Sequence, residues 1–218
     1  MGSHTIIAIN REYGSNGRIV GLEVARKLGI PSHGDDIVGL ASQYSGIDED
    51  FFKKIDERPT DSFLFMLANN AFTIGSSIGA YQSSLSSDML FTKQSEVIRK
   101  FAEDGDCVIL GRCGNYILRD EPGLISVFIT ADDEFKIKTV MEREEVDRRE
   151  AIKRVRTMNR RRANYYGYYS GREWGACKTY DFMVNTGKLG IETAVDVICN
   201  YVEIVKSRRG QMEERGND

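Results

Sequence analysis

The sequence predicts an α/β domain in which helices flank a parallel β-sheet. Short runs of apolar and β-branched residues recur along the chain, and they are typical of strands buried on both faces. Amphipathic helical patterns separate these runs, which is the alternation that builds a parallel sheet. The first run leads through a glycine-containing loop directly into a helix. At 218 residues, we expect one such domain with an inserted arm or lid.

The overall composition is ordinary for a soluble globular protein. The formal net charge is −3, so nothing requires a nucleic-acid or membrane-surface partner. We find no signal peptide before Thr5 and no run of about 20 apolar residues that would span a membrane. Four cysteines form no CxxC pair, and three of them lie in apolar or motif surroundings, as reduced thiols do. We therefore expect a cytoplasmic protein with neither nucleic-acid nor membrane partners. The cysteines are Cys107, Cys113, Cys177 and Cys199.

The N-terminal stretch combines the three parts of a phosphate site. Thr5 to Ile9 is a buried strand, Asn10 to Gly17 is a turn-rich loop, and Arg18 to Leu28 is a helix that Gly29 can cap. Loop amides are unpaired, glycines let the backbone approach a ligand, and a helix N-terminus carries roughly half a positive charge. The stretch therefore predicts phosphate binding. The alternative is an ordinary strand–turn–helix unit without a ligand.

The loop departs from the P-loop pattern G-x-x-x-x-G-K-[ST]. Aligned on Gly17, the sequence has Glu12 for the first glycine, Arg18 for the lysine and Ile19 for the serine or threonine. Arg18 still offers positive charge to a phosphate, as a planar fork. Ile19 cannot bind Mg²⁺, so any metal would take its ligands from water, phosphate and a carboxylate elsewhere.

Two carboxylates follow, at the start of a helix predicted over Ile37 to Tyr44. Asp35 and Asp36 suit a helix cap, or Asp35 lies beside the phosphate loop near a metal or an acceptor nucleotide. Residues 45–90 are expected to form an inserted arm, with a helix and a mobile stretch between residues 62 and 90. This arm could instead be a loosely packed helix pair, an oligomer surface or a substrate cover.

A second buried strand leads into an arginine. Phe91 to Asp104 is an amphipathic helix, and Cys107 to Leu110 is the strand that follows it. Ligands of parallel sheets bind at the carboxyl ends of the strands, so Arg112 is expected in the same crevice as the glycine loop. Its guanidinium suits bidentate phosphate recognition. The alternative is a salt bridge to a helix carboxylate.

An arginine-rich segment lies between the last two strands. A strand over Leu124 to Ala131 precedes helices over Asp132 to Glu144 and Asp147 to Tyr165. Basic residues of the second helix have no acids after Glu150, and either a lid over transferring phosphates or a solvated face explains them. The lid is predicted over residues 147–176, and its Tyr and Trp residues either pack it onto the body or stack on a base. The basic residues are Arg148, Arg149, Lys153, Arg154, Arg156, Arg160, Arg161 and Arg162.

The chain ends with a strand over Thr179 to Asn185 and a helix over Leu189 to Val205. Residues 5–205 are expected to form a single domain, and residues 206–218 a charged, frayed tail.

Five motifs in this order resemble the cytidylate kinase-like family of nucleoside monophosphate kinases, over most of the chain. The resemblance implies a P-loop NTPase-type fold with an acceptor arm and an arginine-rich lid. The motifs are INREYGSNGR (Ile9 to Arg18), VILGRCGNYIL (Val108 to Leu118), NRRRANYY (Asn159 to Tyr166), Trp174-Gly175 and YDFMVNT (Tyr180 to Thr186).

The resemblance also implies site residues. The loop residues would hold the donor phosphates and Arg112 the acceptor phosphate. Apart from the resemblance, the position of Asp35 predicts that it binds the acceptor as well. Asp181 matches a late aspartate of the family. The chain departs from the family at Cys113, which replaces an aspartate that contacts the base, and at Asn159, which replaces an aspartate of the lid. The loop residues are Gly14, Ser15, Asn16, Gly17 and Arg18, and the lid arginines are Arg156 and Arg162.

We therefore predict transfer of the ATP γ-phosphoryl group, with Mg²⁺, to a nucleoside monophosphate resembling CMP or to a related small acceptor. Arg18, Arg156 and Arg162 would be the catalytic cations. Two other hypotheses stay open. One is a nucleotide sensor without turnover, which the lost lysine and hydroxyl of the loop favour. The other is an interaction protein on a relic kinase fold, with a homodimer formed through residues 62–90.

Overall fold

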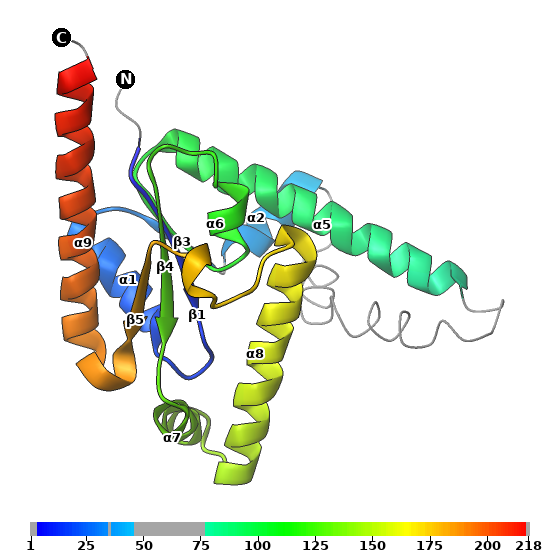
Figure 1. The fold of residues 1–218 in the computed structure, drawn as a ribbon. Helices are drawn as coiled ribbons and strands as arrows, with labels where there is room; N and C mark the ends of the chain where they lie inside the picture. Colours follow the sequence, from blue (N-terminus) through cyan, green and yellow to red (C-terminus); the bar gives the residue numbers. More distant parts are fainter. Residues whose placement is uncertain (1–3, 35, 46–76, 217–218) are drawn as a thin grey trace.

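The computed structural model describes residues 4–34, 36–45 and 77–216 of the chain. Within these residues, five strands form one parallel sheet of order β2-β3-β1-β4-β5 (Figure 1). Helices cover both faces, so the predicted α/β architecture is confirmed. The strands are β1 (Ile6–Arg11), β2 (Ser32–His33), β3 (Cys107–Leu110), β4 (Leu124–Thr130) and β5 (Phe182–Asn185).

The strand order reverses at β1. β3 and β2 lie on one side of it, and β4 and β5 lie on the other. Because all the strands are parallel, the loops that follow β1, β3 and β4 emerge at one edge of the sheet. Such a reversal is where open α/β sheets bind their ligands.

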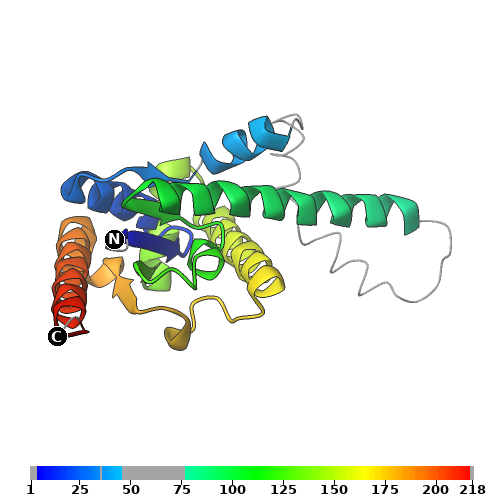
Figure 2. The same ribbon diagram turned by 90° about the horizontal axis from the view of Figure 1, so that it is seen from above.

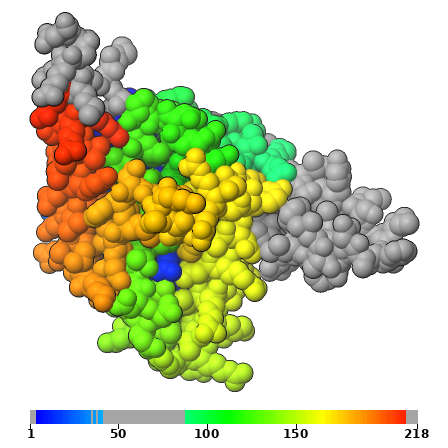
Figure 3. Space-filling view, viewed as in Figure 1, coloured from blue at the N-terminus to red at the C-terminus, as the bar shows by residue number. Residues whose placement is uncertain are grey.

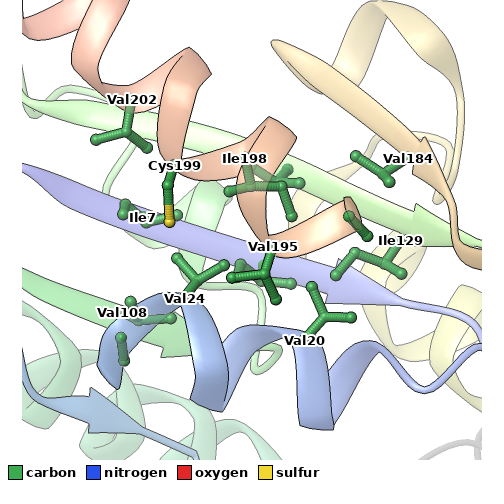
Figure 4. Close-up of a cluster of buried hydrophobic side chains, with 14 of the residues drawn as sticks. Ile7, Val20, Val24, Val108, Ile129, Val184, Val195, Ile198, Cys199 and Val202 are labelled. Carbon is green, nitrogen blue, oxygen red and sulfur yellow. The ribbon is translucent and has the colours of Figure 1, made fainter. Parts of the chain in front are cut away.

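The central strand supplies both layers of the core. Ile7 and Ile9 face one side of the sheet and Ile6 faces the other, because side chains alternate along a strand. All three are at most 1% exposed, which explains why the strand reads as a continuous apolar run. On the first side, helix α1 (Gly17–Leu28) packs beside helix α9 (Thr186–Gly216), with Val20, Val24, Val195 and Ile198 over the strands (Figure 4).

Four helices contribute to the opposite layer. They are α2 (Asp36–Ser45), α5 (Ser77–Asp104), the short α6 (Gly114–Ile117) and the C-terminal end of α8 (Arg148–Ser170). Tyr166 of α8 is 2% exposed within this layer, and the Tyr169 ring stacks on Phe91 at 3.9 Å. Of the two interpretations of the aromatic segment, packing onto the body is thus the one that the contacts support. The first turns of α5 extend past the body (Figure 2).

Helices α7 (Asp133–Glu144) and α8 form a hairpin with a small core of its own. Ile137 and Val140 of α7 pack against Ala151 and Val155 of α8. The ring of Tyr13, from the loop after β1, packs against the same cluster. The arginine-rich segment is therefore joined to the phosphate loop through one aromatic side chain.

The last helix is longer than predicted. We expected it to end at Val205 and the tail to fray, but α9 continues to Gly216, with a break in helical geometry at Gly190. Lys206 pairs with Asp106, and Arg209 donates a hydrogen bond to the Leu124 carbonyl oxygen. Lys, Arg, Gln, Met and Glu all favour helix, and these contacts fix the added turns.

Three other boundaries also differ from expectation. Strand β5 begins at Phe182, because residues Cys177–Thr179 form a 3₁₀ turn. Helix α8 continues to Ser170, through the aromatic segment that contains the buried Tyr166. Helix α5 begins at Ser77, so the end of the predicted arm is helical, whereas the rest of the arm lies outside the described residues.

Candidate functional site

The loop after β1 has the geometry of an anion site. Gly14 has a φ of 82° and Asn16 a φ of 57°, and these two left-handed residues turn the chain into α1. The first turn of α1 contains no acidic residue. Among the hydrogen bonds between described residues, none is donated by the amides of Gly14 or Asn16. Amides at a helix N-terminus attract phosphate.

Contacts from distant residues hold this loop in place. The Ser15 carbonyl oxygen accepts a 2.7 Å hydrogen bond from the hydroxyl of Thr186, which is fully buried at the start of α9. The Ser15 hydroxyl donates to the Glu12 carbonyl oxygen at 2.8 Å. The Tyr13 amide donates to Oδ1 of Asn159 at 2.7 Å. Asn159, which departs from the family pattern, therefore links the loop to α8.

Glu12 does not place its charge in the loop. Its Oε2 atom accepts hydrogen bonds from the Thr130 hydroxyl at 2.5 Å and from Lys136 Nζ at 2.9 Å. Lys136 also pairs with Asp133 at 2.9 Å, and its side chain is 6% exposed. Burial by itself lowers the pKa of Lys136, but the hydrogen bonds to Asp133 and Glu12 outweigh it and the pKa is raised. Lys136 of α7 therefore neutralises Glu12, the residue that stands where the P-loop pattern has its first glycine.

The turn after β3 carries Arg112. Gly111, Arg112 and Cys113 have φ values of 78°, 54° and 56°, three consecutive left-handed residues. Such geometry costs about 1–2 kcal/mol for each non-glycine residue, and backbone strain of this kind clusters at functional sites. Cys113 is 2% exposed, and burial raises the pKa of its thiol to about 12. The strained backbone keeps Arg112 at the carboxyl edge of the sheet.

Arg162 of α8 reaches the same edge. Its Nη1 atom donates a 2.8 Å hydrogen bond to the Arg11 carbonyl oxygen, and its guanidinium lies 5.5 Å from the centre of the Tyr13 ring. The pKa of Arg162 falls to about 10, mainly through burial, and the charges of Arg143 and Arg112 add to the shift. Positive charges thus gather beside the phosphate loop.

The other predicted site residues lie in different surroundings. Arg18 is exposed in the first turn of α1. Arg156 is exposed on α8. The pKa of Asp133 is lowered mainly by the hydrogen bond and the charge of Lys136, and the charge of Arg156 contributes least. Asp35 lies outside the described residues. Arg112 lies near enough to Arg162 for its charge to lower the Arg162 pKa, and the functional roles of both residues stay predictions.

Some arginines of the basic segment form ion pairs with glutamates on the surface of the α7–α8 hairpin. Arg148 bonds to both carboxylate oxygens of Glu134, and Arg154 pairs with Glu144 at 2.7 Å and with Glu150 at 2.9 Å. The sequence of α8 alone did not reveal these ion pairs, because two of the three carboxylates belong to α7. The start of the basic segment is therefore a solvated, paired face, Arg162 further along is half-buried, and the lid stays a prediction.

A buried polar chain runs from the sheet to α8. Asn10 Nδ2 donates to Asn115 Oδ1, and Asn115 Nδ2 donates to the Tyr166 hydroxyl, each at 3.0 Å. These three residues are at most 5% exposed.

Asp181, the late aspartate of the family motif, accepts hydrogen bonds from the amide and hydroxyl of Ser126. It joins β5 to β4 away from the loop edge.

Sequence reasoning missed Arg11, Lys136 and the contact between Tyr13 and Glu144. Each acts through a partner more than 90 residues away in the chain, so no local pattern identifies it.

Figure 3 shows a hollow on the face of the molecule seen in that view, with N-terminal atoms (blue) between α8 (yellow) and the segment leading to α9 (orange).

The donor set suits a polyphosphate better than a protein-bound metal. Among the described residues, no group of three or more His, Cys, Asp or Glu side chains is placed to hold a metal ion. Glu12 is engaged by Lys136, and Ile19 offers no hydroxyl. A Mg²⁺ ion fits here chiefly through phosphate oxygens and water, as is usual for this ion.

No helix in the described part of the chain is both long and apolar enough to cross a membrane.

The sheet order, the glycine loop opening α1 and the arginines beside it define a P-loop kinase-type fold. A family model described as the cytidylate kinase-like family matches residues 6–188. The chain therefore belongs to the cytidylate kinase-like family.

Solved structures share the fold of this chain. An uncharacterized protein from Eubacterium ventriosum is 31% identical, with a TM-score of 0.66, and the match covers 92% of this chain and 99% of that one. A shikimate kinase from Bacteroides thetaiotaomicron (13% identity, TM-score 0.53, 92% and 99% coverage) and a gluconokinase from Sinorhizobium meliloti (12%, 0.51, 95% and 99%) share the fold. No curated protein matches significantly.

Proposed function

We propose that this protein transfers the γ-phosphoryl group of ATP, with Mg²⁺, to a nucleoside monophosphate or a related small acceptor. Family membership and the P-loop kinase fold support nucleotide-dependent phosphoryl transfer in general. The observation that carries the proposal is a hydrogen bond: Arg162 bonds the Arg11 carbonyl oxygen at the edge of the sheet where left-handed Gly14 and Asn16 turn the loop into α1 and where the Arg112 turn also lies. Clustered cations of this kind suit an anion with several charges.

The site residues would have different roles in the reaction. The loop from Gly14 to Gly17 and the start of α1 would hold the donor phosphates, with Arg18 at their outer side. Arg162 would neutralise charge that develops on the transferred group. Phosphoryl transfer needs positioning and charge stabilisation and no covalent intermediate. The bound metal would supply further neutralisation of the phosphates.

Arg112 would orient the acceptor's phosphate by two parallel hydrogen bonds. Asp35 would lie near the acceptor, and Arg156 would approach from the exposed part of the lid. Cys113 would not read a base as an aspartate does, since a thiol is a weak hydrogen-bonding group. The acceptor need not be CMP.

A ligand panel tests this function. We would measure thermal unfolding with ATP, GTP, CMP, dCMP, UMP and AMP, each with and without Mg²⁺, and follow phosphoryl transfer for pairs that bind. Binding at 100 times the dissociation constant stabilises the folded state by about 2.7 kcal/mol. A shift with ATP and one monophosphate supports the kinase. No shift with any nucleotide would reject it.

Arg18→Ala should reduce any detected transfer, while Arg26→Ala on the same helix, with a side chain 75% exposed, serves as the control. If Arg18→Ala leaves the rate unchanged, the proposed role of the loop arginine is wrong.

One alternative has a specific observation in its favour. Ile19 is 47% exposed at the position where a P-loop hydroxyl would bind Mg²⁺, which favours a nucleotide sensor without turnover. Such a sensor would show shifts with a triphosphate and no product with any acceptor. A homodimer formed through residues 62–90 and a cytoplasmic location also stay predictions.

A further inference from the structure

Tyr13 belongs to the phosphate loop, but its side chain contacts the α7–α8 hairpin. The ring packs against the apolar cluster of the hairpin, and the hydroxyl donates a hydrogen bond to Glu144 at the end of α7. The Tyr13 amide donates to Oδ1 of Asn159 on α8 at 2.7 Å. Both helices of the hairpin therefore hold one residue of the loop.

The ring of Tyr13 also lies beside two guanidinium groups. The Cζ atom of Arg143 is 4.8 Å from the ring centre and that of Arg162 is 5.5 Å from it, within the range of roughly 6 Å for cation–π attraction. Nη1 of Arg162 donates at 2.8 Å to the Arg11 carbonyl oxygen, in the peptide group that leads to the loop. Arg162 is therefore oriented by the loop backbone and by an aromatic ring of the loop.

One face of α8 supplies these contacts. Val155, Asn159 and Arg162 follow one another at spacings of four and three, so they lie along the same side of the helix. Val155 packs in the core of the hairpin, Asn159 accepts the Tyr13 amide, and Arg162 lies by the Tyr13 ring. The position of Tyr13 thus sets the position of this helix face relative to the loop.

An arginine that is already oriented binds an anion better than a free one. Its side chain has many rotamers, and fixing them only when the ligand arrives lowers the affinity. In this structure the Tyr13 ring and the Arg11 carbonyl oxygen hold the Arg162 side chain in the absence of a ligand. The affinity for phosphate should therefore depend on the ring.

We propose that Tyr13 is a positioning residue that orients the guanidinium of Arg162 toward phosphates bound at the loop. The inference rests on the proposed function, in which Arg162 neutralises the transferred group. It assigns a role to a position that the P-loop pattern leaves variable. Tyr13 acts through Arg162 and does not itself bind the phosphates, so its removal should matter only while Arg162 is present.

A double-mutant cycle separates this role from a general effect on folding. Binding of inorganic tripolyphosphate and of ATP is titrated calorimetrically for the wild type, Tyr13→Leu, Arg162→Gln and the double variant. The control is Tyr201→Leu, because the Tyr201 ring of α9 also packs against a core and stacks on Phe182 at 4.9 Å. Thermal midpoints and ATP-dependent transfer are recorded for every variant.

We expect Tyr13→Leu to weaken tripolyphosphate binding by about 3- to 10-fold, the effect of having to order one long side chain on binding. In the Arg162→Gln background the same substitution should change the affinity by less than about 2-fold. Tyr201→Leu should lower the thermal midpoint and bind as the wild type does.

Tyr13→Phe keeps the ring beside Arg162 and loses the hydrogen bond to Glu144, so it should bind more tightly than Tyr13→Leu. If Tyr13→Leu does not fold, Tyr13→Phe decides the question, since its smaller effect should likewise disappear in the Arg162→Gln background.

Wild-type affinity in the folded Tyr13 variants, or an equal loss in both backgrounds, would make Tyr13 a structural residue and leave the kinase proposal intact. Failure of the wild type to bind either probe would reject both proposals. The expected cycle without any ATP-dependent transfer would uphold the role of Tyr13 and reject the kinase.

Discussion

Two turns meet at the carboxyl edge of the sheet, and they are stabilised in different ways. The loop after β1 is held by side chains from α7, α8 and α9, through Lys136, Asn159 and Thr186. The turn after β3 is held by its own backbone, with a hydrogen bond from the Gly114 amide to the Gly111 carbonyl oxygen, and by burial of Cys113. The first turn therefore depends on charge and on contacts from α7, α8 and α9, and the second on close packing.

Lys136→Met should have the largest effect. It leaves the Glu12 carboxylate, whose side chain is 20% exposed, without its cation beside the phosphate loop. Breaking a largely buried ion pair costs about 3–4 kcal/mol, to be measured as the free energy of unfolding in urea. ATP binding should weaken as well, because the uncompensated charge repels phosphate.

Lys138→Met is the matched control on α7, since the Lys138 side chain is 78% exposed and its ion pair with Glu142 is 3.8 Å long. It should change stability by less than about 0.5 kcal/mol. Equal effects of the two substitutions would mean that the first turn does not depend on Lys136.

Replacing the glycine of each turn with alanine compares the two turns directly. Gly14 and Gly111 share a left-handed φ near 80°, but an added Cβ at Gly14 would lie 2.6 Å from the Lys136 backbone oxygen, whereas at Gly111 it would meet the far end of the Arg11 side chain. Backbone cannot move aside as a side chain can. Gly14→Ala should therefore cost roughly 2–3 kcal/mol in unfolding free energy, and Gly111→Ala less.

Gly29→Ala isolates the cost of backbone strain, because Gly29 has a φ of 68° with nothing within 4 Å of an added Cβ. It should cost about 1 kcal/mol. If Gly14→Ala costs no more than Gly29→Ala, the close approach of α7 to the loop does not contribute.

The smallest effect is a pH dependence confined to the first turn. The pKa of Glu144 is lowered to about 2: burial opposes the shift, and hydrogen bonds from Arg143, Arg154 and the Tyr13 hydroxyl outweigh it. A lowered folded-state pKa gives stability that is present above the unfolded value of 4.5 and is lost as pH falls toward 2. Because Arg143 and Arg154 are at least 40% exposed, solvent screening weakens these interactions, and we expect about 0.5–1 kcal/mol of unfolding free energy.

The difference in unfolding free energy between the wild type and Glu144→Gln should therefore be full at pH 6 and should vanish near pH 2. Thermal or urea unfolding across this range measures it. The effect should be absent from Glu142→Gln, whose carboxylate is exposed and makes a long contact with Lys138. A difference that persists at pH 2 would point to packing instead of charge.

The sequence alone determined the architecture. Buried strands, the glycine loop and the helices between them are local patterns, because apolar periodicity and turn residues act over a few neighbours. Strands alternating with helices then require a parallel sheet, and a parallel sheet places Arg112 at the same edge as the loop. Gly29 ends α1 in the left-handed conformation, as its position predicted.

Only the tertiary structure decided which charges are neutralised. Lys136 meets Glu12 across 124 residues, and Tyr13 meets Glu144 across 131. The course of Arg11 toward Gly111 is likewise set by neighbouring strands. Helix packing brings these partners together, and sequence periodicity shows which face of a helix is buried but not which distant residue lies opposite it.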